Sequence, residues 1–483
     1  MKMRVTDFWL YRWRYLIGYT GIVIVIGIVI AIASMYVPGA LRQGEVTSAL
    51  ISGNLSFKSM TPEMVIDLPY HILQRLSFMA FGVTTLSIKL PSIMLGVATA
   101  LGIFLLVRTW FRRNVAVLTT IIATTTTQFL FLVQDGTPAI MFSFLTVWIL
   151  FAATYVTRKK LFSTLWKVVA GVLMAASLYT PLGIYLVLAV MTTIFFHPHI
   201  RHIVTHFARP RLIIAILLGI LSTAPLIYAS ILNHHVALSL IGIPDGALDM
   251  KQNLHDVGLS LFGFNAASNS YLLRPVYSLG LLLLMAVGVY KLLTYKYTAR
   301  SYITLTLGLL MVPLVLLNPT EVSNLFPLAV LMIALGIATL ITDWYKLFPR
   351  NPYARVAGMV PLGILVGGIV FSGILRYMNN YEYNQDVLKD YSSDLKIVQS
   401  ELVRQQAKPE TTRLIVAPSE LPFYDLVSHY DQRFSASTSY EHAPAMTLVT
   451  HAAYHAKKPD TAPTSIVTNR LAGDADRLYI YKK

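Results

Sequence analysis

The feature that most constrains this chain is a series of eleven apolar segments, each close to the length of about 20 residues that a helix needs to cross a bilayer. Only 13% of the 483 residues are charged, against about 25% in a soluble domain. This composition excludes a soluble enzyme, a disordered protein and a nucleic-acid-binding protein, despite a net charge of +16. The segments cover 16–37, 90–107, 114–133, 138–156, 163–179, 181–197, 212–232, 272–290, 302–318, 323–342 and 356–375.

The distribution of charge predicts how these segments are oriented. If the N-terminus is cytoplasmic, the inner segments carry 20 basic and 2 acidic residues, whereas the outer loops carry 6 basic and 8 acidic residues. Cytoplasmic loops of membrane proteins are enriched in lysine and arginine. We therefore expect a multi-pass protein of the cell membrane, with a cytoplasmic N-terminus, a retained first helix and an extracytoplasmic C-terminus.

Two outer loops are long. The first, 38–89, contains an amphipathic stretch over 63–82, and we expect short helices there that lie on the outer membrane surface. The second, 233–271, is expected to be ordered only in part. The residues of the first loop that we predict to share one helical stripe are Val65, Leu68, Ile72, Leu73, Leu76 and Phe78.

The composition changes after residue 376. The tail 377–483 has no apolar run long enough to span a membrane, and its basic and acidic residues are nearly equal in number. Apolar residues recur at helical spacing over 387–403, and short strands are predicted at 413–417, 465–468 and 478–481. The fold class is thus an all-α polytopic membrane domain, 1–376, followed by a small soluble α/β domain, for which a structural role is favoured over substrate binding.

The acidic residues are the best guide to a functional site. The chain has no cysteine, no phosphate-binding glycine loop, no HExxH and no nucleophile elbow. Eight of the ten acids in 1–376 face outward, and Glu45, Asp67 and Asp135 lie close to the membrane surface. Asp135 stands in the four-residue loop QDGT, where a carboxylate either serves a polar cavity or simply supports a tight Asp-Gly turn.

Four motifs in the first third of the chain resemble the polyprenyl-phosphate-dependent glycosyltransferases of the GT-C superfamily. They are LPYHIL at 68–73, FG at 81–82, LSIKLPS at 86–92 and FRRNVAV at 111–117. Their order and spacing are similar to those of the family-39 type, which includes protein mannosyltransferases and lipid A aminoarabinose transferases. The resemblance implies the GT-C fold and transfer of a sugar from a polyprenyl-phosphate carrier to an extracytoplasmic acceptor, with inversion.

The same resemblance implies roles for the acids. The family has an Asp-Glu pair after the first span, and here Gly44 replaces the Asp while Glu45 keeps the second position. Glu45 is therefore expected to be the general base, with Asp135 positioning the acceptor or the sugar, and Asp67 is a third candidate. The sequence departs from the family pattern again at Asp67, in place of a basic residue, and at Thr137, in place of an arginine.

The leaving group would be a lipid phosphate, which requires cationic stabilisation. The candidates for binding the phosphate or donor are Lys58, Arg75, Lys89, Tyr70 and His71. The alternative is that the three basic side chains snorkel towards headgroups, which is favoured for Lys89 and balanced against phosphate binding for Arg75. No cofactor or metal ligand set is predicted, and a divalent metal is not excluded. The adjacent His234 and His235 are more typical of a surface loop than of a metal site.

Two alternatives are compatible with the sequence. A catalytically inactive relative would bind lipid-linked sugar without turning it over, and the replaced Asp, basic and Arg positions fit that interpretation. A lipid or sugar transporter or flippase is less favoured, because the sequence shows no internal repeat with paired broken helices.

Overall fold

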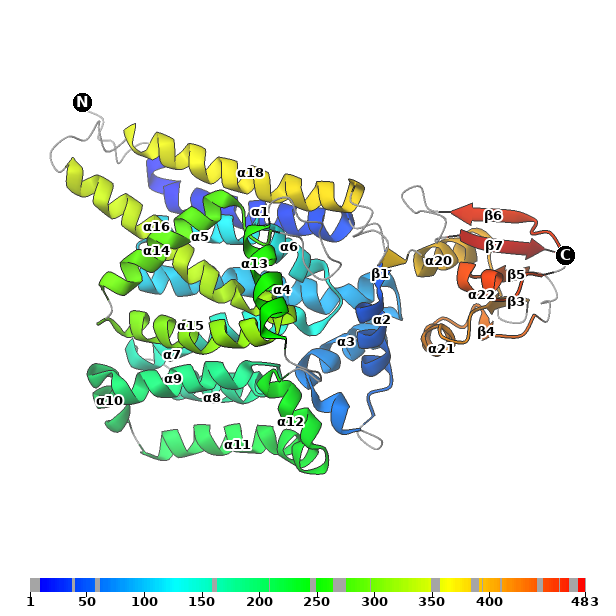
Figure 1. The fold of residues 1–483 in the computed structure, drawn as a ribbon, viewed down its shortest axis with the longest axis horizontal. Coiled ribbons are helices and arrows are strands. Elements are labelled where there is room, and N and C mark those ends of the chain that lie inside the picture. The colour runs from blue at the N-terminus through cyan, green and yellow to red at the C-terminus, as the bar shows by residue number, and fades with distance from the viewer. Residues whose placement is uncertain are drawn as a thin grey trace.

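The computed structural model describes residues 9–36, 40–56, 61–158, 163–207, 209–243, 249–263, 275–295, 297–348, 357–383, 391–392, 394–408, 411–440, 446–459, 461–468 and 477–482. Figure 1 shows a large helical body with a small sheet domain beside it, and the helices α2 and α3 lie at the end of the body that faces the sheet. The first helix, α1 (Trp9–Tyr36), begins at the opposite end of the body from the sheet domain.

The helical body is built from α-helices joined by short loops and 3₁₀ turns. Its elements are α1 (Trp9–Tyr36), β1 (Leu41–Arg42), α2 (Gln43–Gly53), η2 (Pro62–Val65), α3 (Leu68–Phe81), α4 (Thr85–Trp110), α5 (Arg113–Thr124), α6 (Thr127–Gln134), η3 (Pro138–Ile140), α7 (Met141–Arg158), α8 (Ser163–Ser177), α9 (Gly183–Phe196), α10 (Pro198–Thr205), α11 (Arg209–Leu232), α12 (His234–Ile241), α13 (Met250–Phe262), α14 (Leu279–Thr294), α15 (Ala299–Leu317), η4 (Pro319–Leu325), α16 (Phe326–Leu347) and α18 (Met359–Tyr383).

The apolar helices agree with the predicted segments. Within the described ranges, six helices are long and apolar enough to cross a membrane, and two bent helix pairs raise that number to eight. Three shorter apolar helices cover Leu16–Ala31, Thr164–Ser177 and Leu279–Thr294. Each of the eleven predicted segments falls on one of these helices or pairs.

Both bends have a local cause. Between α5 and α6, the chain turns by 63° at a run of threonines, where Thr124 and Thr125 donate their hydroxyls to backbone carbonyls of the preceding turn. Such bonds compete with the helical ladder and help to end it. Between α9 and α10 the chain turns by 92° at Pro198, which begins the new helix and disfavours a helical conformation for His197.

The core of the body is packed through close backbone contacts as well as side chains. A Cβ atom on Gly288 of α14 would lie 2.1 Å from the carbonyl oxygen of Met332, and one on Gly336 of α16 would lie 2.3 Å from that of Leu284. Only glycine permits this approach, which is a common way for helices to associate in membranes. The α14–α16 pair therefore forms a rigid wall of the body.

The C-terminal domain is a five-stranded mixed sheet with helices, as predicted. The strand order is β4-β3-β5-β7-β6, with β3 parallel to β4 and β5, and β7 antiparallel to β5 and β6. The predicted strands correspond to β3, β6 and β7, whereas β4 and β5 were not predicted. The elements are β2 (Tyr391–Ser392), α20 (Asp394–Arg404), β3 (Thr412–Ile415), α21 (Leu421–Tyr430), β4 (Ser435–Ser437), β5 (Met446–Val449), α22 (His451–Ala456), β6 (Ser465–Thr468) and β7 (Arg477–Lys482).

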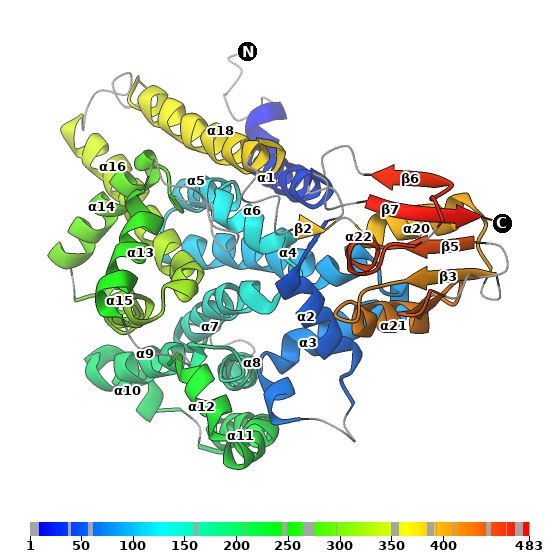
Figure 2. The ribbon, with the colours of Figure 1, turned by 45° about the vertical axis from the view of Figure 1, so that its right-hand side comes forward.

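This domain packs directly on the first outer loop. One hydrophobic cluster combines Ala49 of α2, Phe78 of α3 and Ile88 of α4 with the buried side chains of the sheet. In addition, β1 pairs with β2 in an antiparallel register that places Arg42 opposite Tyr391. Figure 2 shows α2 and α3 lying against the sheet domain on the side of α21. The tail is therefore joined to the segment that carries the candidate acids.

The predicted apolar stripe of the first loop is wrong as a single face. Val65, Leu68 and Phe78 are buried, whereas Ile72, Leu73 and Leu76 are exposed. The physical reason is that consecutive residues of a helix are about 100° apart, so Phe78 points almost opposite to Leu76. The helix α3 thus has two apolar faces, one in the core and one available to a membrane surface.

Candidate functional site

Glu45 enters the site as the third residue of α2. Its Oε2 accepts a hydrogen bond of 2.8 Å from the backbone N–H of Arg42, which caps the helix from within. The side chain is completely buried. Burial raises the pKa of Glu45, and the nearby Lys89 ammonium acts against that rise.

The second oxygen of Glu45 connects α2 to the turn between α6 and α7. Its Oε1 accepts a hydrogen bond of 2.6 Å from the backbone N–H of Gly136 and lies 3.4 Å from Nζ of Lys89. A Cβ atom at position 136 would lie 2.7 Å from a methyl group of Ile88 and 3.1 Å from Glu45 Oε1. The Asp-Gly turn seen in the sequence therefore requires its glycine, because the carboxylate approaches the backbone there.

Asp135 lies beside Glu45 and forms an ion pair with the neighbouring arginine. Its Oδ2 is 2.5 Å from an Nη atom of Arg42 and accepts a hydrogen bond of 2.8 Å from Thr137 Oγ1. Burial by itself would lower the pKa of Arg42, but attraction to Asp135 outweighs it, so the pKa lies above the usual range. Asp135 Oδ1 is buried and has no hydrogen-bond partner among the residues that the structure describes.

Lys89 completes the charged cluster. Its ammonium donates to Gln134 Oε1 at 3.0 Å and lies 5.8 Å from the ring centre of Tyr391 in β2. With only 4% of its surface exposed, Lys89 does not extend towards headgroups, so the snorkelling alternative is wrong for this residue. The site cluster, which we define as Arg42, Glu45, Lys89 and Asp135, thus holds two cations and two carboxylates.

A layer of buried polar side chains packs against the site cluster and holds its segments in place. Gln74 of α3 donates to the backbone carbonyls of Ile88 and Gly136, at 2.9 and 3.0 Å. Its Oε1 accepts hydrogen bonds from Ser48 and Ser52 of α2. Every polar atom of this buried amide is therefore used, which fixes α2, α3, α4 and the Asp-Gly turn relative to one another.

Tyr70 and His71 lie in this supporting layer. Ser52 Oγ is 2.8 Å from Nδ1 of His71, and burial lowers the pKa of His71 to about 4. The imidazole is thus neutral near pH 7 and carries no charge for a phosphate. The hydroxyl of Tyr70 is 2.8 Å from Ser92 Oγ, and burial raises the pKa of Tyr70, with Asp135 among the carboxylates that raise it further.

Asp67 lies apart from the site cluster. It precedes α3 with a left-handed backbone, φ +53°, which few non-glycine residues adopt. Its side chain is buried, and this burial raises the pKa of Asp67 to about 8, although the Thr180 hydroxyl lowers it in part. Asp67 is therefore largely protonated near pH 7.

The structure brings together three of the predicted residues, Glu45, Asp135 and Lys89. Arg75 is half-buried on α3 and takes no part in the hydrogen bonds of the cluster within the described ranges. Lys58 lies outside the described residues.

Sequence reasoning missed four residues of the site: Arg42, Gln74, Gln134 and Tyr391. The available signals were Arg42 three residues before Glu45 and Gln134 beside Asp135. Nothing in the sequence indicated Tyr391, because it reaches the site only through the pairing of β1 with β2.

No metal site emerges from the part of the chain that the structure describes. No group of three or more histidine, cysteine or acidic side chains in those ranges is arranged to hold a metal ion. His234 and His235 are exposed at the start of α12, with ring centres 4.5 Å apart.

Comparisons with known proteins agree with the sequence motifs. Residues 69–228 match the family model described as dolichyl-phosphate-mannose-protein mannosyltransferase. This match covers about a third of the chain and includes Lys89 and Asp135 but not Glu45. No curated protein matches the sequence.

A solved structure of low sequence identity has the same fold. The apo oligosaccharyltransferase of Archaeoglobus fulgidus matches with a TM-score of 0.52 and 12% identity, over 88% of this chain and 65% of that chain. ArnT from Cupriavidus metallidurans bound to undecaprenyl phosphate matches with a TM-score of 0.49 and 14% identity, over 95% of this chain and 97% of that chain. The resemblance to GT-C glycosyltransferases is thereby confirmed: the chain has the GT-C fold, and its apolar helices are those of a multi-pass membrane protein.

Proposed function

We propose that this protein is an integral membrane glycosyltransferase that transfers a sugar from a polyprenyl-phosphate carrier to an extracytoplasmic acceptor. The observation that carries the proposal is the site cluster, in which two cations and two carboxylates from three separate segments meet in the interior. Charged groups are costly to bury, and clusters of this kind are typical of functional sites. The matching family model names a lipid-phosphate sugar, which is the chemistry that such a cluster suits.

We assign the two carboxylates different roles. Both oxygens of Glu45 are engaged by backbone N–H groups, and Lys89 neutralises its charge, so Glu45 holds the site together. Asp135 keeps one oxygen without a hydrogen-bond partner in the described structure. We therefore place the base role on Asp135 and the positioning role on Glu45, the reverse of the expectation from the family motif.

The proposed reaction is a single displacement. The acceptor oxygen forms a bond to the anomeric carbon as the bond between that carbon and the phosphate oxygen breaks. The acceptor proton passes to Asp135 Oδ1, and the phosphate leaves with the electron pair. In this proposal Lys89 and Arg42, the two cations of the cluster, stabilise the departing anion. The general-base help from Asp135 would contribute about 10²–10⁴-fold.

The test compares Asp135→Asn with Glu45→Gln in purified protein supplied with polyprenyl-phosphate mannose and related lipid-linked sugars. We expect Asp135→Asn to lower the release of polyprenyl phosphate by about 10²-fold or more while donor binding is kept. Glu45→Gln should lower activity and thermal stability together. Asp343→Asn, an exposed acid near the end of α16, is the control and should match wild type. A wild-type rate in Asp135→Asn would contradict the assignment.

A non-catalytic lipid-sugar-binding protein is the second candidate, because Gly44 stands where the family has Asp. Among the described residues, a Cβ atom at position 44 would meet a methyl group of Thr137 at 3.7 Å, an ordinary contact distance, so a Cβ atom is accommodated there. If the glycine has removed activity, Gly44→Asp should create turnover where wild type shows binding alone. If the protein is an active enzyme, Gly44→Asp should change the rate by no more than about tenfold.

A further inference from the structure

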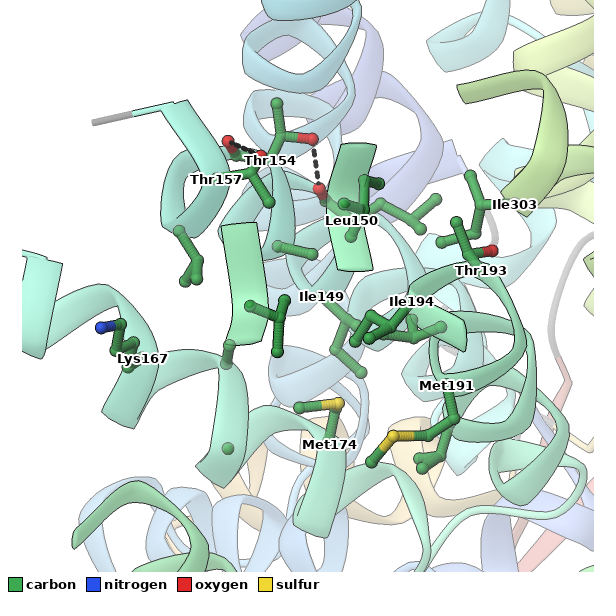
Figure 3. A pocket seen from close by; sticks show the side chains of 18 of the residues that line it. Ile149, Leu150, Thr154, Thr157, Lys167, Met174, Met191, Thr193, Ile194 and Ile303 are labelled. Carbon is green, nitrogen blue, oxygen red and sulfur yellow. Dashed lines mark hydrogen bonds between the residues drawn. The ribbon is translucent and has the colours of Figure 1, made fainter. Parts of the chain in front are cut away.

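A second candidate site lies in the helical body. It is a partly open cavity of about 850 Å³ lined by residues of α7, α8, α9, α10, α11 and α15. Its lining extends from Trp110, at the opposite end of α4 from Lys89, to Leu178, just after α8. Figure 3 shows Met174, Met191 and Ile194 pointing into the space between the helices, with Lys167 at its margin. Trp110 lines the cavity at the end of α4, and Lys89 lies near the start of the same helix, about 30 Å away along its axis.

Two features of the backbone shape the cavity: a close approach of α8 and α11 at Gly171, and the bend between α9 and α10. A Cβ atom on Gly171 of α8 would lie 2.9 Å from the carbonyl oxygen of Ala215, so α8 and α11 approach closely at this point. The chain turns by 92° between α9 and α10, and Ile200 and Val204 of α10 thereby form part of the lining. The space is thus shaped by the backbone.

The walls offer hydrocarbon and little hydrogen bonding. The hydroxyls of Thr154, Thr157 and Thr193 line the space, but each donates to a backbone carbonyl of its own helix, at 2.7 to 2.9 Å. Most other lining residues are aliphatic or methionine. A sugar would lose its hydrogen bonds to water here without replacement, whereas a hydrocarbon chain would gain apolar contact.

Charge is confined to the margin of the cavity. The lining set contains Lys167 and Arg300 and, within the described residues, no acidic side chain. Lys167 is buried, with its ammonium 3.9 Å from the ring centre of Phe207. Arg300 donates a hydrogen bond to the backbone carbonyl of Trp110, which holds the guanidinium at the end of α4. An apolar space bordered by Lys167 and Arg300 has the chemistry of a site for an anionic amphiphile.

We propose that this cavity binds an anionic phospholipid, with an acyl chain between α8, α9 and α11 and the phosphate near Lys167. Under the predicted orientation this end of the bundle faces the cytoplasmic leaflet, where anionic phospholipids are abundant and basic pockets between helices bind their headgroups. The separation of about 30 Å between Trp110 and Lys89 argues against the phosphate of the sugar donor as the group bound at this margin. Such a lipid would fill the space and brace α9, α10 and α11.

The test is native mass spectrometry of the purified full-length protein with added phosphatidylglycerol or phosphatidylcholine of equal chain length. Wild type should retain phosphatidylglycerol about fivefold better, which is the contribution expected of one nearby basic side chain. Lys167→Gln should remove this preference. Ala153→Phe, which places a ring in the cavity, should reduce retention of both lipids.

Lys291→Gln is the matched control, because Lys291 also lies over an aromatic ring, at 4.3 Å from Tyr295, but does not line the cavity. It should keep the wild-type preference. Equal retention of the two lipids by wild type, or an unchanged preference in Lys167→Gln, would overturn the proposal. Undecaprenyl phosphate that displaces phosphatidylglycerol from wild type but not from Lys167→Gln would also overturn it, in favour of a carrier-lipid site.

Discussion

The two ends of α4 lie in opposite chemical surroundings. Near its start, Lys89 is buried with Glu45 and Asp135, and each charge in the site cluster is balanced by another. Beyond its end, Lys167 and Arg300 border an apolar cavity whose lining has no acid in the described residues. The net charge of +16 therefore combines two arrangements: cations paired with acids at one end of α4, and cations bordering an apolar cavity at the other. In our proposals, paired charges form the reaction site at one end, and cations in a cavity lining without acids among the described residues bind anionic lipid at the other.

Removal of one partner of the buried pair should have the largest effect on stability. Lys89→Met leaves the Glu45 carboxylate buried without its cation, and we expect a loss of about 3–5 kcal/mol of unfolding free energy. Lys346→Met removes the exposed ion pair with Asp343 at the other end of the bundle and should cost about 0–1 kcal/mol. Thermal unfolding in detergent measures both.

The double variant Glu45→Gln/Lys89→Met sharpens this result. Because it removes both charges, it should recover part of the stability that Lys89→Met loses. Equal losses in Lys89→Met and Lys346→Met would show that the two ends do not differ in how they hold charge.

The stability of the folded protein should depend on pH through His71, in the polar layer behind the site cluster. Since the pKa of His71 is lowered to about 4 in the folded protein, the unfolded chain binds a proton near pH 6.5 that the folded chain does not. Stability should therefore fall as the pH decreases from about 6.5 to 4, by up to about 3 kcal/mol. His71→Asn should flatten this part of the profile, and identical profiles for the two proteins would contradict the buried neutral imidazole.

The effect of Asp67 on stability should change with pH in the opposite direction. Its pKa is raised to about 8 in the folded protein, so the folded chain keeps a proton that the unfolded chain loses near pH 4. Stability should therefore decrease as the pH rises from about 4 to 8. Asp67→Asn should raise the melting temperature at pH 8 more than at pH 5, because asparagine carries no charge and tolerates the left-handed backbone. If Asp67→Asn changed the melting temperature by the same amount at pH 5 and pH 8, that result would argue against a buried carboxyl group at this position.

The sequence predicted the apolar helices well and the site in part. Helices in lipid must satisfy their own backbone, so long apolar runs identify them directly. Glu45 and Asp135 were found because residues 1–376 contain only ten acids, eight of which are predicted to face outward, and because these two lie at positions of a family motif. Arg42, Gln74 and Tyr391 were not found, because their roles depend on contacts between segments far apart in sequence, above all the pairing of β1 with β2.

The prediction of one apolar stripe on the first loop failed for a related reason. Spacing shows which residues are apolar, but the sheet domain decides which face of α3 is covered. Phe78 is buried within the cluster that includes the sheet, whereas Leu76 on the other side of the helix is exposed.

A structure with polyprenyl phosphate bound tests the central claim most directly. The account predicts the phosphate group within hydrogen-bonding distance of Lys89 or Arg42, with Asp135 Oδ1 facing the position that an acceptor oxygen would occupy. A phosphate held beside Lys167, or one bound on the outer face without contact to the site cluster, would contradict the claim that these paired charges form the reaction site.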